Sequence, residues 1–185
     1  MAEQQEDRIA QALKKALAGD HPAFAELVKE HQRMVFSIAY HFVHNRALAE
    51  DLAQEVFLQL YQKLSEIQSP AHLVYWLRRV TAHRCIDQSR RLRPEIGLED
   101  APPQSTMPRL VDPLLHQHLR NGVAALPEKW RAMVILRYQE ELDLAEISEL
   151  LDIPLNTVKS GLQRSLAELR KRLMRKSGGV RYAIF

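Results

Sequence analysis

The chain has 185 residues, of which 46% are hydrophobic and 26% are charged. This length suits one compact domain or two small ones, and the hydrophobic fraction is too high for a wholly disordered chain. No apolar run reaches the roughly 18 residues that a membrane-spanning helix needs. The acidic N-terminus is unlike a secretory signal, and the only cysteine, Cys85, excludes an internal disulfide. Together these features predict a cytoplasmic protein.

The net charge of +3 is distributed unevenly along the chain. Residues 76–93 carry a net charge of +5 and residues 157–176 carry +6, so the rest of the chain is acidic. Two concentrated basic segments in an otherwise acidic chain indicate a polyanionic partner that is bound at two places.

The apolar spacing in the first half of the chain predicts three helices. Asp20 and Asn45 are candidate N-caps for the first and second helices, and Pro70 follows a break before the third. The third helix has an apolar stripe formed by Leu73, Trp76, Leu77 and Val80. No segment alternates with a period of two residues, so strands are not expected.

Five of the nine prolines lie between positions 94 and 113. This segment lacks helical or strand periodicity and is predicted to be a flexible, extended linker. After it, start signals at Asp112–Pro113, Leu126–Pro127, Asp143 and Asn156–Thr157 predict four further helices. We therefore expect an all-α fold of two small helical domains joined by a proline-rich linker, with a helix-turn-helix in the second domain. The predicted parts are a domain at 1–93, the linker at 94–113, a domain at 114–176 and a tail of unassigned role at 177–185.

The helix-turn-helix candidate consists of a short helix after Asp143, a sharp turn at residues 152–154 and a longer helix with a basic outer face. If the stripe from Val158 to Leu173 faces inward, several polar and cationic residues lie on or beside the opposite face. Lysine and arginine can bond guanine edges, and glutamine can bond adenine. The alternative is an ordinary helical hairpin with a solvated, charged face; the basic bias and the turn spacing favour DNA.

Two stretches of the chain carry a family resemblance. The C-terminal one, residues 126–173, reads LPEKWRAMVILRYQEELDLAEISELLDIPLNTVKSGLQRSLAELRKRL. The N-terminal one contains AEDLAQEVFLQLYQKL, followed by YWLRRV and IDQSRR. They resemble, in the correct order, the two domains of the minimal extracytoplasmic-function (ECF) RNA polymerase sigma factors of the sigma-70 family.

The resemblance implies that the chain binds core RNA polymerase, at its clamp and flap regions, and promoter DNA, both double- and single-stranded. It allows an anti-sigma factor as a further partner. The residues that match the family's polymerase-docking helix are Asp51, Gln54, Glu55 and Leu58. Those expected to read the −35 element are Thr157, Lys159, Ser160, Gln163, Arg164 and Lys171.

The segment after position 67 resembles the part of the family that opens the −10 element. An extruded base needs an alternative polar or stacking site, and the single strand needs cationic contacts. The residues expected there are Gln68, Ser69, His72, Tyr75, Arg78, Arg79, His83, Arg84, Arg90 and Arg91. Trp76 is expected to pack in the core instead.

Two residues depart from the family pattern. Gly161 stands where a long residue is usual, so we expect a lost phosphate contact and weaker −35 binding. His83 stands where asparagine is common, which affects the −10 preference.

Enzyme functions fit the sequence poorly. The histidine pairs His41/His44 and His116/His118 lack a nearby carboxylate and cysteine cluster, and no glycine-rich phosphate loop occurs. We expect no catalytic residue, no metal site and no cofactor. The alternatives to a sigma factor are a stand-alone helix-turn-helix regulator and, from another class, a helical protein-interaction adaptor.

Overall fold

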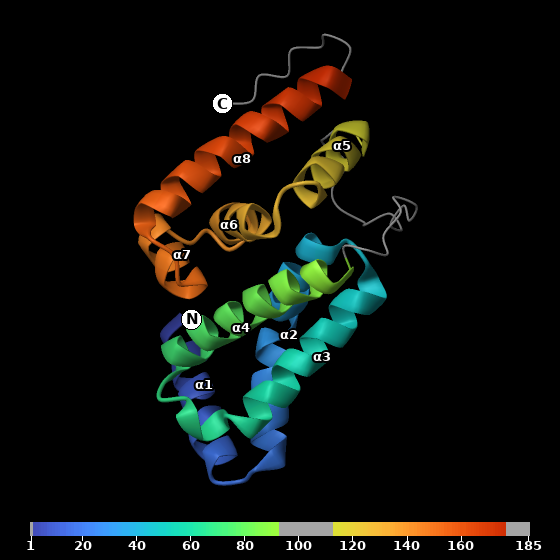
Figure 1. Cartoon of the computed structure of the whole chain (residues 1–185). Helices are drawn as coiled ribbons and strands as arrows, with labels where there is room; N and C mark the ends of the chain where they lie inside the picture. Colours follow the sequence, from blue (N-terminus) through green and yellow to red (C-terminus); the bar gives the residue numbers. More distant parts are fainter. Residues whose placement is uncertain (1, 93–112, 177–185) are drawn as a thin grey trace.

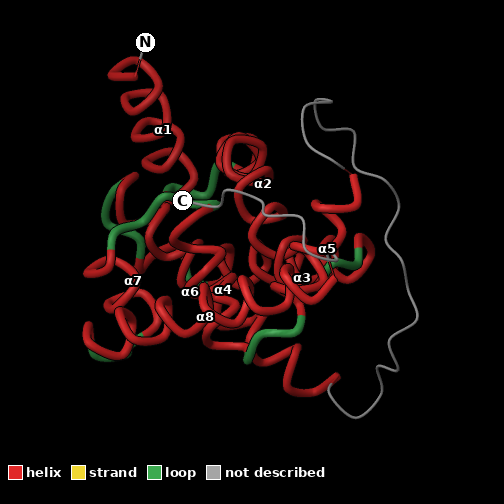
Figure 2. The backbone as a smooth tube through the Cα atoms, turned by 90° about the horizontal axis from the view of Figure 1, so that it is seen from above, coloured by secondary structure: helices red, strands yellow, loops and turns green. Residues whose placement is uncertain are grey.

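The computed structural model describes residues 2–92 and 113–176, and all regular structure within these ranges is helical (Figures 1 and 2). The elements are α1 (Ala2–Leu17), α2 (His21–Val43), α3 (Arg46–Gln62), the 3-10 turn η1 (Leu64–Glu66), α4 (Pro70–Leu92), α5 (Pro113–Ala124), α6 (Glu128–Tyr138), α7 (Leu144–Leu151) and α8 (Leu155–Lys176). The prediction of an all-α fold is confirmed. The predicted linker, apart from Pro113, and the tail lie outside the described residues.

Side-chain caps fix the starts of several helices where the sequence predicted them. The Asp20 carboxylate accepts a bond of 3.0 Å from the amide of Ala23, and the Asn45 side chain accepts one of 3.0 Å from Leu48. At α7, Asp143 and Glu146 form a capping box in which each side chain accepts from the other residue's amide. Such caps satisfy backbone N–H groups that a helix leaves unpaired at its start.

Helix α1 was not predicted from the sequence. It buries Ile9, Ala12, Leu13 and Ala16, which follow helical spacing. The Arg8 guanidinium lies 2.6 Å from the Glu30 carboxylate and 3.3 Å from that of Glu26, so it joins α1 to α2. The polar composition of the segment concealed this narrow apolar stripe.

The first helix group, α1–α4, is arranged around α2, which contacts each of the other three helices (Figure 1). Its fully buried side chains include Leu27, Val35 and Phe42 from α2 and Leu73 and Leu77 from α4. Trp76 is partly buried and packs against this core, as expected. Burial of large apolar side chains is the main stabilising contribution in such a bundle.

The second helix group, α5–α8, is built on α8, which contacts α5, α6 and α7. The turn between α7 and α8 is held by Asp152, in the left-handed conformation with φ of 54°, and by a bond of 2.6 Å from the Ser148 hydroxyl to the Ile153 carbonyl. Val158, Leu162, Leu169 and Leu173 are buried, so the apolar stripe of α8 faces inward as predicted.

Gly161 lies on the buried side of α8, against α6. A Cβ atom added there would lie 2.6 Å from Met133 Sδ and 3.2 Å from Met133 Cε. Position 161 therefore faces the core of the second group rather than solvent. The expectation that this glycine costs a phosphate contact is wrong, because a long side chain here would meet Met133 before it met DNA.

The two groups also contact each other, through α2 and α4 on one side and α6 and α7 on the other. One hydrophobic cluster includes buried residues of both groups. Its members include Ile38, Phe42, Ala82, Cys85, Ile86, Met133, Leu136, Leu150 and Leu151.

We predict that Gly161→Ala destabilises the chain by about 1 kcal/mol, because overpacking against Met133 outweighs the gain in helix propensity. In a Met133→Ala background the same change should stabilise by roughly 0.5–1 kcal/mol, since the obstructing atoms are gone. Urea unfolding followed by circular dichroism measures both. Stabilisation by Gly161→Ala in the otherwise unchanged chain would contradict the close approach of α8 to α6.

Candidate nucleic-acid interface

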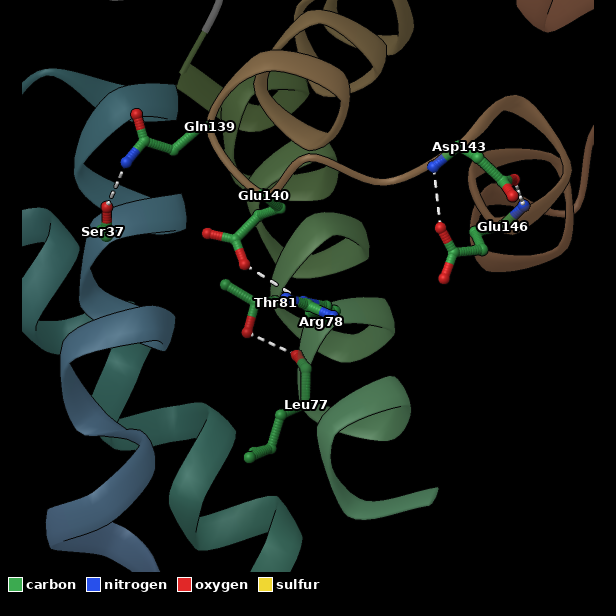
Figure 3. Close-up of polar contacts among 8 residues, drawn as sticks. All are labelled: Ser37, Leu77, Arg78, Thr81, Gln139, Glu140, Asp143 and Glu146. Carbon is green, nitrogen blue, oxygen red and sulfur yellow. Dashed lines mark hydrogen bonds and ion pairs between the residues drawn. The ribbon is translucent and has the colours of Figure 1, made fainter. Parts of the chain in front are cut away.

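The cationic row of α4, formed by Arg78, Arg79, Arg84, Arg90 and Arg91, begins beside the second helix group. Arg78 Nε lies 3.1 Å from the Glu140 carboxylate, and the Arg78 and Glu140 side chains are 25% and 8% exposed (Figure 3). Arg79 Nη1 donates to the Glu149 carbonyl at 3.0 Å and to the Tyr75 hydroxyl at 3.2 Å. The Tyr75 hydroxyl in turn donates to the same carbonyl at 3.4 Å. All three residues are predicted to contact the −10 strand. Arg78 bonds the Glu140 carboxylate in the turn before α7, and Tyr75 and Arg79 share the Glu149 carbonyl in α7.

The segment that precedes α4 is ordered by its own polar side chains. The Ser69 hydroxyl accepts from the His72 amide at 3.1 Å, and His72 Nδ1 accepts from the Gln68 amide at 3.2 Å. Gln68 is exposed, while Ser69 and His72 are half-buried. Gln68 therefore lies just before α4 with its side chain open to solvent.

The remaining predicted cations of α4 have different surroundings. Arg84 Nη1 lies 3.1 Å from the Glu55 carboxylate, and Arg84 also donates to Gln59 at 2.9 Å, so it joins α4 to α3. His83 Nδ1 lies 2.8 Å from the Arg79 carbonyl. Arg90 and Arg91 are exposed near the end of the helix, with Arg90 3.8 Å from the Asp87 carboxylate.

The outer face of α8 is open to solvent. Thr157, Lys159, Gln163, Arg164 and Lys171 are exposed. Ser160 is half-buried, and its hydroxyl donates to the Thr157 carbonyl at 3.2 Å. In Figure 1, α8 lies on the side of the second group that faces away from α1–α4. The residues predicted for −35 reading thus form one accessible polar and cationic face.

The residues predicted to dock on the polymerase lie on the solvent side of α3. Asp51, Gln54, Glu55 and Leu58 are all exposed, and the Leu58 side chain is 64% exposed. A single exposed leucine is ordinary on a protein surface, so the assignment of this face to polymerase docking remains what the family resemblance predicts. Glu55 already has a cationic partner in Arg84, which relieves its repulsion with Asp51 one turn away.

Arg131 on α6 is a link between the groups that the sequence did not indicate. Its Nη1 donates to the Phe42 carbonyl, the last buried position of α2, at 3.0 Å, and its guanidinium lies 4.9 Å from the centre of the Phe42 ring. Nη2 donates to the carbonyls of Ala124 and Leu126. A cation at a helix C-terminus is favourable because it faces the negative end of the helix dipole.

His44 caps α2 beside this arginine. Its backbone is left-handed, with φ of 53°, and its amide donates to the Tyr40 carbonyl at 2.8 Å. Both ring nitrogens are buried without a hydrogen-bond partner among the described residues. The pKa of His44 is lowered to about 4. The main cause is burial of the ring, and the nearby His41, Arg131 and Arg120 lower it further.

Cys85 is fully buried, and burial raises the pKa of its thiol to about 12. This agrees with the predicted role as a small core residue. Within residues 2–92 and 113–176, no group of three or more His, Cys, Asp or Glu side chains is arranged to hold a metal ion. No helix in the same ranges has the length and apolar character needed to cross a bilayer.

Known families match both helix groups in order. The pattern described as sigma-70 region 2 matches residues 27–95, and that of sigma-70 region 4 matches residues 116–169. The chain is 30% identical over 181 residues to the ECF RNA polymerase sigma factor SigW of Bacillus subtilis, covering 89% of this chain and 96% of the relative. The chain belongs to the ECF sigma factors.

A further ECF relative and two solved structures also match this chain. SigE of Mycolicibacterium smegmatis is 33% identical over 164 residues, covering 84% of this chain and 63% of the relative. The sigma factor RpoE of Bartonella quintana, solved with the anti-sigma factor NepR, has a TM-score of 0.68 at 16% identity, covering 83% of this chain and 98% of that one. CnrH, solved with the cytosolic domain of CnrY, has a TM-score of 0.65 at 18% identity, covering 91% and 99%. These structures share the fold of this ECF sigma factor.

We predict that acid destabilises this sigma factor through His44. The unfolded ring takes up a proton near pH 6.5 and the folded ring only near pH 4. The folded state therefore binds fewer protons between these values, so stability is full above pH 6.5 and falls as the pH drops toward 4. His44→Asn, which tolerates the left-handed backbone, should reduce the loss of unfolding free energy between pH 7 and pH 5 by about 1 kcal/mol.

Urea unfolding at the two pH values measures this difference. Some acid sensitivity should remain in the variant, because burial also lowers the pKa of His31 and His41. If the unfolding free energy of His44→Asn depends on pH as strongly as that of the unsubstituted chain, the acid sensitivity does not come from His44.

Proposed function

We propose that the chain is the promoter-recognition subunit of RNA polymerase: it binds the core enzyme, directs it to promoters through their −35 and −10 elements, and assists strand opening. The observation that carries this proposal is the exposed cationic face of α8 within a helix-turn-helix, in a chain that matches sigma-70 regions 2 and 4 in order. The matches to both regions favour this function over a stand-alone regulator or an adaptor. Catalysis of RNA synthesis belongs to the polymerase, so no catalytic residue is assigned to this chain.

The work is divided between three surfaces. The outer face of α8 would enter the major groove at −35, where Arg164 and Gln163 have the donors and acceptors to read base edges. Residues 68–72 and the cations of α4 would hold the opened −10 strand. The exposed side of α3 would dock on the clamp of the enzyme, and the second group would reach its flap region. The site of action would be the cytoplasm, where the polymerase and its template are found.

An anti-sigma factor is a further proposed partner. Two solved structures of the same fold, RpoE and CnrH, are complexes with the proteins NepR and CnrY. The surfaces described above are the ones such a protein would have to cover in order to prevent initiation.

Run-off transcription with purified core polymerase and a library of promoters tests the function. The reconstituted enzyme should initiate from a subset of templates on which core enzyme alone is inactive. Equal, background levels of transcript from both enzymes on all templates would overturn the proposal.

We predict that Arg164→Ala abolishes the preference for one −35 sequence while polymerase binding is retained. Loss of a good pair of base contacts costs about 1–3 kcal/mol of discrimination, which is roughly a 5- to 150-fold change in relative initiation. Transcription from promoters that differ at single −35 positions measures the change. Lys14→Ala, which removes one exposed positive charge from α1, is the matched control. An equal loss on every promoter would argue against base reading by Arg164.

A double substitution tests the docking surface. Asp51→Ala with Glu55→Ala should weaken binding to core polymerase several-fold, because two exposed carboxylates beside Leu58 are removed. Glu6→Ala with Asp7→Ala removes the same charge from the exposed side of α1 and should leave the affinity unchanged. Affinity is measured by fluorescence anisotropy of labelled protein titrated with core enzyme. Equal affinities of the two double variants would remove α3 from the interface.

A further inference from the structure

Two reciprocal side-chain bonds order the segment that leads into α4. The Ser69 hydroxyl accepts from the His72 amide at 3.1 Å, and the Ser69 carbonyl accepts from the Leu73 amide at 2.9 Å, so Ser69 is the N-cap of α4. His72 Nδ1 in turn accepts from the Gln68 amide at 3.2 Å. In a standard capping box the third helical residue accepts from the amide of the N-cap itself. Here the acceptor reaches one residue further back, to Gln68.

The bond to Gln68 fixes the chemical state of the His72 ring. A backbone amide can only donate, so Nδ1 is the nitrogen without a hydrogen, and the hydrogen of the neutral ring is on Nε2. With Nδ1 engaged in this way, the ring can form a hydrogen bond to DNA only through Nε2. The ring is half-buried, whereas Gln68 is exposed.

Gln68 is held on both sides along the chain. Ile67, which precedes it, is buried, and its amide donates to the Leu64 carbonyl at 3.0 Å. Ser69, which follows it, caps α4. The bond to His72 then fixes the peptide unit between Ile67 and Gln68, and with it the direction in which the Gln68 side chain leaves the backbone. A glutamine amide has a donor end and an acceptor end, so the base edge that it can bond depends on this direction.

We infer that His72 is a positioning residue for Gln68: Nδ1 of His72 holds the Gln68 amide, and the Gln68 side chain rather than the His72 ring selects the base of the opened −10 strand. This assignment rests on the proposed role of residues 68–72 in promoter opening. It gives different roles to three residues that the sequence predicted as equivalent DNA contacts. Gln68 reads the base, Ser69 starts the helix, and His72 orders the backbone between them.

Two substitutions at position 72 separate positioning from direct contact. Asparagine can place its Oδ1 where histidine has Nδ1, so His72→Asn keeps an acceptor for the Gln68 amide and loses the Nε2 donor. Glutamine can place its amide nitrogen where histidine has Nε2, so His72→Gln keeps that donor. Its side-chain oxygen can accept from the Ser69 amide as in a standard capping box, which preserves the start of α4 but leaves the Gln68 amide without its acceptor. His118→Gln, at another half-buried histidine, on α5, is the matched control.

Run-off transcription with core polymerase, on promoters that differ at single −10 positions, measures the base preference. Gln68→Ala identifies the promoter position that Gln68 reads. At this position His72→Asn should keep the preference within about twofold, and His72→Gln should reduce it by about threefold to tenfold, the effect of one hydrogen bond. His118→Gln should leave the preference unchanged. A role in helix stability alone predicts the opposite order, because glutamine is a better helix former than asparagine.

Nuclear magnetic resonance of the full-length, ¹⁵N-labelled chain tests the same contact without polymerase. At about pH 8, above the usual titration range of histidine, the His72 ring should carry its hydrogen on Nε2. Exchange of the Gln68 amide with solvent should be slow in the unsubstituted chain and in His72→Asn, and fast in His72→Gln.

Loss of the base preference in His72→Asn, or its full retention in His72→Gln, would overturn the inference. A hydrogen on Nδ1 of His72, or rapid exchange of the Gln68 amide in the unsubstituted chain, would do so as well. If the unsubstituted chain initiates at no promoter, the proposed function is wrong, and the exchange and ring spectra still decide whether His72 holds Gln68.

Discussion

A guanidinium as enclosed as that of Arg78 needs an oxygen partner, because a buried charge without one costs several kcal/mol. Glu140 meets this need across the boundary between the two helix groups. Among the described residues, Tyr75 and Arg79 join α4 to α7 through a backbone carbonyl, while Gln139 and Arg131 make hydrogen bonds to α2. The relative position of the two groups therefore depends in part on the polar contacts of one face of α4.

Apolar burial and polar contacts contribute differently to this boundary. The shared hydrophobic cluster that includes Phe42 and Met133 supplies non-directional attraction, which tolerates small shifts of one group against the other. Arg131 makes directional contacts, because its guanidinium donates hydrogen bonds to carbonyls at the end of α2 and at the end of α5. The boundary thus combines shared apolar burial with a few directional hydrogen bonds.

Much of the fold could be predicted because it depends on interactions between residues that are close in the sequence. Asp20, Asn45 and Asp143 each begin a helix as short polar residues followed by apolar spacing, and a cap acts over three residues only. The residues on the outer face of α8 could be predicted as well, because the apolar residues of this segment recur with the period of a helix. By contrast, Arg78 and Glu140 are 62 positions apart, and nothing in either local sequence indicates that they meet. The same holds for Gly161 and Met133, where the residue pattern suggested a missing DNA contact and the packing of two helices explains the glycine.

The capping box of α7 and the left-handed turn at Asp152 are made entirely from residues 143–158, and α8 rests on α5, α6 and α7. None of these supports comes from α1–α4. The angle at which α8 leaves the turn is thus set mainly by contacts within the second helix group. The face of α8 proposed to read the DNA groove is therefore ordered by the second helix group before any duplex is bound.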